Sequence, residues 1–166
     1  PISFINEDGD TLDIDYIIPD ANACFTCHNN AGSETPIGPR LRTMNMNNQL
    51  QDLIDANYLT GVSDVSTISQ LPDWEDETNY TREERARAYF DVNCAHCHVE
   101  GGFCELQSTL RLSYETPFDD TNIFNQRFSI MNRMQNYQPG FSMPYIGTTR
   151  VHSEGFEMIQ SYLNSL

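Results

Sequence analysis

The pentapeptides CFTCH (residues 24–28) and CAHCH (residues 94–98) are two copies of a Cys-x-x-Cys-His motif and contain four of the chain's five cysteines. In each copy the two thiols lie about one helical turn apart, so both can form thioethers with the vinyl groups of one porphyrin. The histidine that follows then lies beneath the iron as its proximal ligand. This spacing is the attachment signature of c-type haem. The two copies therefore predict two covalently bound haems.

The residues assigned to this role follow directly from the motif. The four thioether cysteines are Cys24, Cys27, Cys94 and Cys97, and the two proximal iron ligands are His28 and His98. A zinc site is the main alternative, because two Cys-x-x-Cys pairs can also hold Zn²⁺. Zinc would not need a histidine directly after the second cysteine, yet both copies have one. We expect Cys104, the remaining cysteine, to be a free buried thiol.

The bulk properties exclude several classes of protein. The chain has 166 residues, enough for one medium domain or two small ones. Its formal net charge of -15 argues against a nucleic-acid partner, because phosphate binding needs clusters of Lys and Arg. The charge is consistent with high solubility, or with steering towards a basic face of a redox partner. No stretch approaches the roughly 20 apolar residues of a membrane span, and no signal peptide is present, so we interpret the chain as a mature form or an excised module.

Hydrophobic periodicity predicts a mainly α fold with short helices and long loops. Thr81 and Glu84 form a capping box that begins the clearest helix, which leads into the second haem motif. The expected helices cover residues 45–58, 81–93, 129–134 and 153 to the C-terminal end.

The N-terminal residues 1–22 alternate between apolar and polar positions around a turn at residues 7–10, which predicts a small β-hairpin or an extended arm. The polar, acidic stretch 61–79 is the best candidate for a linker. We therefore expect two haem-binding halves, residues 1–75 and residues 76–166.

The second half resembles a class I cytochrome c. It has a helix bearing Tyr89 and Phe90 before the haem motif, a later Met143-Pro144, and a terminal helix with Phe156 and Tyr162. In that family the first and last helices cross at aromatic residues, and a methionine followed by proline is the distal iron ligand. The resemblance implies that Met143 ligates the second haem. A thioether ligand favours ferrous iron and raises the reduction potential.

The first half resembles the same family over a shorter stretch. Gly38-Pro39-Arg40-Leu41 matches the family's Gly-Pro-x-Leu segment. The resemblance implies that the carbonyl of Pro39 accepts a hydrogen bond from Nδ1 of His28 and fixes the orientation of the ring. This half lacks both the preceding helix and the Met-Pro loop, so its distal ligand stays open.

Most of the chain also resembles a bacterial dihaem cytochrome module that occurs alone or at the C-terminus of larger secreted proteins. The shared features include Asn48-Gln49-Leu50 and Arg133-Met134. The resemblance implies Met134 as the distal ligand of the first haem, and Arg133 as a partner of a haem propionate. The alternatives for the distal position are Met44, Met46, His96, His152 or a vacant site. We expect His96 to be a surface residue and His152 to be a cap or a hydrogen-bonding loop residue.

These features indicate an electron-transfer protein rather than an enzyme, with a periplasmic or extracellular location, because c-type haem is attached outside the cytoplasm. Two other classes stay open if the first haem has a free distal position. One is a dihaem peroxidase, although those enzymes are typically much longer. The other is a haem-based sensor or gas-binding module.

Overall fold

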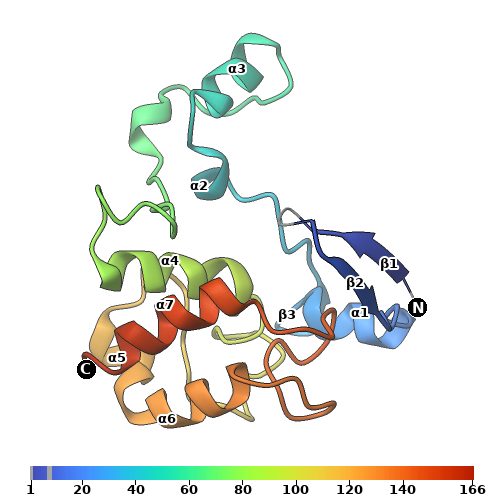
Figure 1. Ribbon diagram of the computed structural model, residues 1–166. Coiled ribbons are helices and arrows are strands. Elements are labelled where there is room, and N and C mark those ends of the chain that lie inside the picture. The colour runs from blue at the N-terminus through green and yellow to red at the C-terminus, as the bar shows by residue number, and fades with distance from the viewer. Residues whose placement is uncertain (1, 7–8) are drawn as a thin grey trace.

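The computed structural model describes residues 2–6 and 9–166, and it consists mainly of helices joined by long loops (Figure 1). The helices are α1 (Ala21–Cys27), α2 (Leu41–Met44), α3 (Gln49–Asp55), α4 (Arg82–Asn93), α5 (Phe118–Thr121), α6 (Ile123–Met134) and α7 (Ser153–Leu163), with a single 3₁₀ turn, η1 (Val65–Thr67). Two small antiparallel hairpins accompany them, formed by β1 (Ile2–Ile5) with β2 (Thr11–Ile14) and by β3 (Asn29–Asn30) with β4 (Ser33–Glu34). This agrees with the mainly helical fold and the N-terminal hairpin that the sequence predicts. Of the expected turn at residues 7–10, residues 7 and 8 lie outside the described part of the chain.

The N-terminal hairpin lies apart from the core. Ile2 pairs with Ile14 and Phe4 pairs with Leu12, so its apolar side chains face one another across the two strands. Every residue of β1 is nevertheless exposed. In the part of the chain that the structure describes, no helix is long and apolar enough to cross a membrane.

Helix α4 begins and ends where the sequence predicts. The hydroxyl of Thr81 accepts a hydrogen bond from the backbone N–H of Glu84, and the Glu84 carboxylate accepts one from the backbone N–H of Thr81, which completes the capping box. The helix ends at Asn93, so Cys94 follows its last turn. The second Cys-x-x-Cys-His motif is therefore attached directly to α4, which has more buried residues than any other helix in the described part of the chain.

The core lies in the second half. Helix α7 packs against both α4 and α6. At its crossing with α4, Gly155 approaches Tyr89 so closely that a Cβ atom there would lie 2.5 Å from the tyrosine hydroxyl. The crossing of the two helices at an aromatic residue matches the expectation from the class I resemblance. The buried apolar side chains that form this cluster are Ala86, Tyr89, Phe90, Ala95, Leu110, Leu112, Ile123, Ile130, Ile159, Tyr162 and Leu163.

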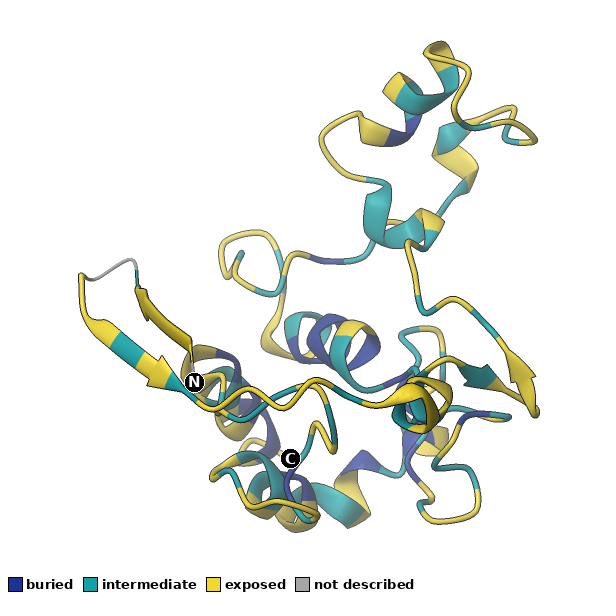
Figure 2. Cartoon of the chain, turned by 90° about the vertical axis from the view of Figure 1, so that its right-hand side faces the viewer, coloured by how far each residue is buried: buried dark blue, intermediate teal, exposed yellow. Residues whose placement is uncertain are grey.

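The first half has almost no core of its own. Among its described residues, only Leu50 and Pro72 are buried. Figure 2 shows the contrast, with exposed and half-buried residues over the N-terminal region and dark blue along α4. Helices α2 and α3 stand away from the helical core in Figure 1.

Two expected helices have other boundaries than the observed ones, and helix α1 was not expected. The helix expected over residues 45–58 is confined to α3, because Asn47 and Asn48 adopt the left-handed conformation and delay its start. The helix expected over 129–134 is the last part of the longer α6, which begins after a left-handed Asn122. The Asp20 carboxylate accepts a hydrogen bond from the backbone N–H of Ala23 and caps α1.

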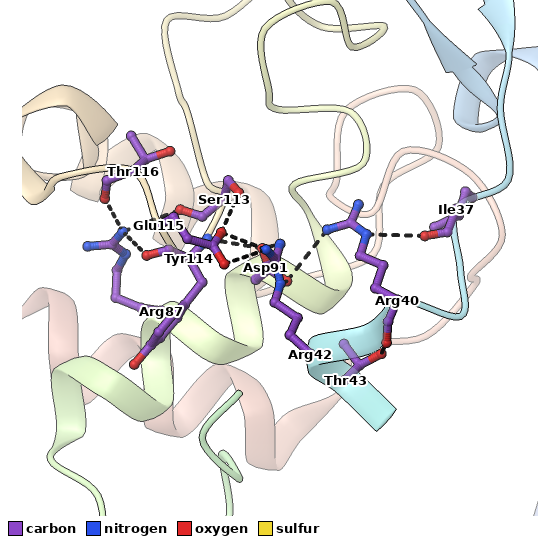
Figure 3. A network of polar contacts seen from close by, with 10 residues as sticks. All are labelled: Ile37, Arg40, Arg42, Thr43, Arg87, Asp91, Ser113, Tyr114, Glu115 and Thr116. Carbon is purple, nitrogen blue, oxygen red and sulfur yellow. Dashed lines mark hydrogen bonds and ion pairs between the residues drawn. The ribbon is translucent and has the colours of Figure 1, made fainter. Parts of the chain in front are cut away.

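An ion-pair network joins the two halves (Figure 3). The Asp91 side chain on α4 is fully buried. It accepts two hydrogen bonds from the Arg42 guanidinium on α2, at 2.6 and 3.2 Å, and one from the backbone N–H of Tyr114 at 3.0 Å. Arg40 lies 3.6 Å from the same carboxylate, and Arg42 also pairs with Glu115 at 2.5 Å. The segment that follows the first haem motif is thus fixed to the helix that precedes the second.

Candidate haem-binding site

The second motif adopts the local geometry that attachment to one porphyrin needs. The backbone N–H groups of Cys97 and His98 both donate to the Cys94 carbonyl, at 3.1 and 3.0 Å. This single turn places the two cysteines on the same side of the chain, about one turn apart. Ala95, between them, is buried against the core. The motif is therefore a rigid extension of α4.

A cavity of about 890 Å³ opens beside this turn. Cys94, Cys97 and His98 line one side of it. Met134 and Met143, from α6 and the loop after it, also line it. Sites for cofactors and small molecules are typically about 300–1,000 Å³. The cavity therefore has both the volume and the ligand types that a haem would need.

His98 is poised to act as a metal ligand. It is buried, and its Nδ1 atom has no hydrogen-bond partner within the described chain. Burial, helped by the nearby positive charge of Arg111 and Arg133, lowers the pKa of His98 to about 4, so the imidazole is neutral. A neutral imidazole is the form that binds metals. A buried polar atom without a partner is unusual in a protein core.

Arg133 positions the loop that carries Met143. The backbone N–H of Met143 donates to the Arg133 carbonyl at 2.9 Å. The Arg133 guanidinium donates to the Phe141 carbonyl at 2.8 Å and lies 4.6 Å from the centre of the Phe141 ring. Buried Ser142 closes the loop through hydrogen bonds with the backbone of Gln138. The position of Met143 in the cavity is thus fixed from α6.

Three aromatic rings pack together beside the cavity, and two of them, Tyr89 and His152, line it. The hydroxyl of Tyr89 and Nδ1 of His152 form a 3.0 Å hydrogen bond, and the two rings stack with their centres 5.8 Å apart. Trp74 packs edge-on against both. Burial raises the pKa of Tyr89 to about 12, so its hydroxyl stays protonated. His152, at the start of α7, is the hydrogen-bonding loop residue that the sequence predicts, although its side chain does not cap the helix.

The first motif is more open. Helix α1 carries Cys24, which is exposed, and Cys27, which is half-buried. The backbone N–H of His28 donates to the Cys24 carbonyl at 2.9 Å, so the two motifs share one local turn geometry. Pro39 is exposed.

The candidate distal ligands of the first haem lie in different places. Met44 is half-buried at the end of α2, and Met46 is 40% exposed just after it. Met134 instead packs against the core of the second half and lines the cavity of the second motif. The structure thus brings Met134 together with His98 and Met143.

The two motifs adjoin each other, which sequence reasoning did not anticipate. One ligand atom each from Cys27, His96 and Cys97 lies within 4.8 Å of the others. Cys97 Sγ also contacts the Thr26 carbonyl at 4.0 Å. Nothing in the spacing of residues so far apart in sequence indicates this proximity. His96 was expected on the surface but is half-buried, because it lies where the two motifs meet.

Cys104 lies next to Cys97. It is a free thiol, as expected, but it is half-buried rather than buried. Its backbone N–H donates to the Cys97 carbonyl at 3.1 Å, and the two thiols share a hydrogen bond. That hydrogen bond lowers the pKa of Cys104 to about 7.

Comparison of the chain with protein-family models, with curated proteins and with solved structures gave no match.

Proposed function

We propose that the chain is a dihaem c-type cytochrome that transfers single electrons between extracytoplasmic redox partners. The observation that carries this proposal is that Cys94, Cys97, His98 and Met143 line one cavity of about 890 Å³. A bound haem would supply an iron that gains and loses one electron. No other cofactor that needs covalent cysteines, an imidazole and a thioether fits this set of residues as well.

The residues around the second motif have separate roles in this proposal. Cys94 and Cys97 attach the porphyrin, His98 ligates the iron from one side, and Met143 ligates it from the other. Tyr89 supports the wall of the cavity and limits the access of water. Arg133 positions the Met143 loop and has a guanidinium close enough to the cavity to pair with a propionate.

The first motif would hold the first haem through Cys24, Cys27 and His28, with the Pro39 carbonyl as the hydrogen-bond partner of the His28 ring. The scarcity of buried apolar side chains in residues 1–75 supports this assignment, because a covalent haem would supply the missing apolar core. Met134 lines the cavity that Cys27 shares with Cys94 and Cys97, so it stays the expected distal ligand here, with Met44 and Met46 as the alternatives. A vacant distal site would instead allow peroxidase-like or sensor chemistry.

The distribution of charge supports a redox partner with a basic face. Seven of the nine basic residues donate to backbone carbonyls or to the buried Asp91: Arg40, Arg42, Arg85, Arg87, Arg111, Arg127 and Arg133. Among the described acidic residues only Asp91 is buried, so negative charge dominates the surface. A basic partner would be attracted over several ångströms and a nucleic acid repelled. Because c-type haem is attached outside the cytoplasm, we place the protein in the periplasm or the cell exterior.

A zinc site is the second candidate, and one observation favours it. Cys27, His96 and Cys97 bring three soft ligand atoms within 4.8 Å, and the Cys104 thiol is hydrogen-bonded to Cys97. Cysteine and histidine are the usual ligands of structural zinc, and of the described residues these three bring their ligand atoms close enough to share one ion. Haem attachment at Cys27 and Cys97 would exclude zinc at this place, so the two candidates are alternatives.

A redox-poised visible and EPR spectrum of the protein, produced in cells that attach c-type haem, tests the proposal. We expect two haems per chain, both reversibly reducible, with at least the second one low-spin and six-coordinate. A high-spin first haem that binds small ligands would shift the function towards a sensor or a peroxidase. A colourless protein that contains zinc would contradict the proposal.

A further inference from the structure

We propose that Cys27 and Cys97, the second cysteines of the two motifs, hold the two haems edge to edge as one electronically coupled pair. This inference rests on the function proposed above. It adds that the haems do not occupy two independent halves. With both haems bound, an electron accepted at one would pass to its neighbour, and the first iron would be oxidised by one electron as the second is reduced.

The proximity of the two sulfur atoms carries the argument. The ligand atoms of Cys27 and Cys97 lie within 4.8 Å of each other, although the residues are far apart in sequence. In a thioether the cysteine sulfur is bonded directly to a substituent of the porphyrin ring. Two sulfurs this close therefore bring one edge of each ring to the same place. Electron exchange between the rings would not need a path through the rest of the protein.

Contacts on both sides of the sulfurs keep the motifs together. The backbone N–H of Ala31, just after the first motif, donates to the Gly101 carbonyl, just after the second, at 2.7 Å. The Thr26 carbonyl contacts Cys97 Sγ at 4.0 Å. On the other side, Arg42 is bound to the buried Asp91, three residues before the second motif. The junction is thus held at several points and does not depend on one flexible contact.

Gly101 offers a way to perturb this junction without removing any ligand. A Cβ atom at Gly101 would collide with Oδ1 of Asn30 and lie 3.3 Å from the backbone nitrogen of Ala31. A larger side chain there would force the loop after the first motif away. Gly61 is a matched control, because its φ of 85° resembles the 77° of Gly101, but a Cβ atom at Gly61 would meet no other atom within 4 Å. Both substitutions strain the backbone, whereas only the one at Gly101 disturbs the junction.

Circular dichroism in the Soret region measures the coupling, because two porphyrins in close contact give a paired positive and negative band. We expect this couplet in the wild-type dihaem protein. It should weaken in Gly101→Leu with two haems retained, persist in Gly61→Leu, and vanish in Cys24→Ala/Cys27→Ala, which keeps only the second haem. As a second measurement, the EPR lines of the oxidised protein should sharpen on half-reduction, when each remaining ferric haem loses its paramagnetic neighbour.

The outcomes separate this inference from the proposed function. A wild-type protein with two haems but one simple Soret band, and EPR lines unchanged on half-reduction, would overturn the coupled pair and leave the dihaem cytochrome intact. A wild-type protein without haem would overturn both. If Gly101→Leu does not fold, the comparison of wild-type protein with Cys24→Ala/Cys27→Ala still decides the question.

Discussion

The pairing of Arg42 with Asp91 gives the sharpest prediction about stability. Asp91 has a fully buried carboxylate, and Arg42 supplies two of its hydrogen bonds from an 18% exposed side chain. In Arg42→Ala the Asp91 carboxylate would keep only the hydrogen bond from the Tyr114 N–H and the longer ion pair with Arg40. Breaking a buried ion pair by removing one partner costs about 3–5 kcal/mol. Because Arg40, 3.6 Å away, can move closer, we expect the lower end, about 3 kcal/mol.

Denaturant unfolding of the haem-loaded protein, followed by far-UV circular dichroism, measures this loss. Arg82 provides the control, since it is an exposed arginine on α4, the helix that carries Asp91. The free energy of unfolding of Arg82→Ala should stay within about 0.5 kcal/mol of the wild-type value. In an Asp91→Asn background the effect of Arg42→Ala should shrink, giving a coupling energy of about 1 kcal/mol or more. A loss below about 1 kcal/mol for Arg42→Ala, or additive effects in the double variant, would refute the reasoning.

Three further predictions concern the iron, the pH and the charge. Met143→Ala should abolish the methionine-to-iron charge-transfer absorption of one haem and lower its potential, as spectroscopic redox titration would show; an unchanged spectrum and potential would exclude Met143 as a ligand. The hydrogen bonds from Thr81 lower the pKa of Glu84, so this carboxylate stabilises the fold above its ordinary pKa of 4.5, and that contribution is lost as the pH falls through the lowered value. Glu84→Gln should therefore flatten the acid side of the stability curve, and parallel curves would count against this. Reduction by a basic partner protein should slow as ionic strength rises, whereas a salt-independent rate would show that the charge of -15 serves solubility alone.

Short-range sequence signals predicted the helices whose ends are set by neighbouring residues. The capping box at Thr81 determined the start of α4, and the C-terminal helix expected from residue 153 is observed as α7. Helix α1 was missed, because its only start signal, Asp20, precedes a segment in which no residue is buried. The helical conformation of its seven residues is supported by the Asp20 cap and not by burial against the core.

The sequence predicted which residues belong to the candidate site, but it did not predict which of them lie next to one another in space. The motifs identified their own cysteines and histidines, and Met143-Pro144 indicated a distal ligand that does line the cavity. The meeting of Cys27 with Cys97 depends on tertiary contacts between distant segments, such as Ala31 with Gly101, which leave no pattern in the sequence. The presence of Met134 in the cavity also depends on tertiary packing, so the Arg133-Met134 dipeptide could not predict it.

The intact mass of the denatured, haem-loaded chain tests the central claim most directly, because thioether-bound haem survives denaturation whereas zinc does not. The account predicts the mass of the 166-residue chain plus two haems, with Soret absorption travelling with the polypeptide. The mass of the bare chain, obtained from cells that attach haem to other c-type cytochromes, would contradict it.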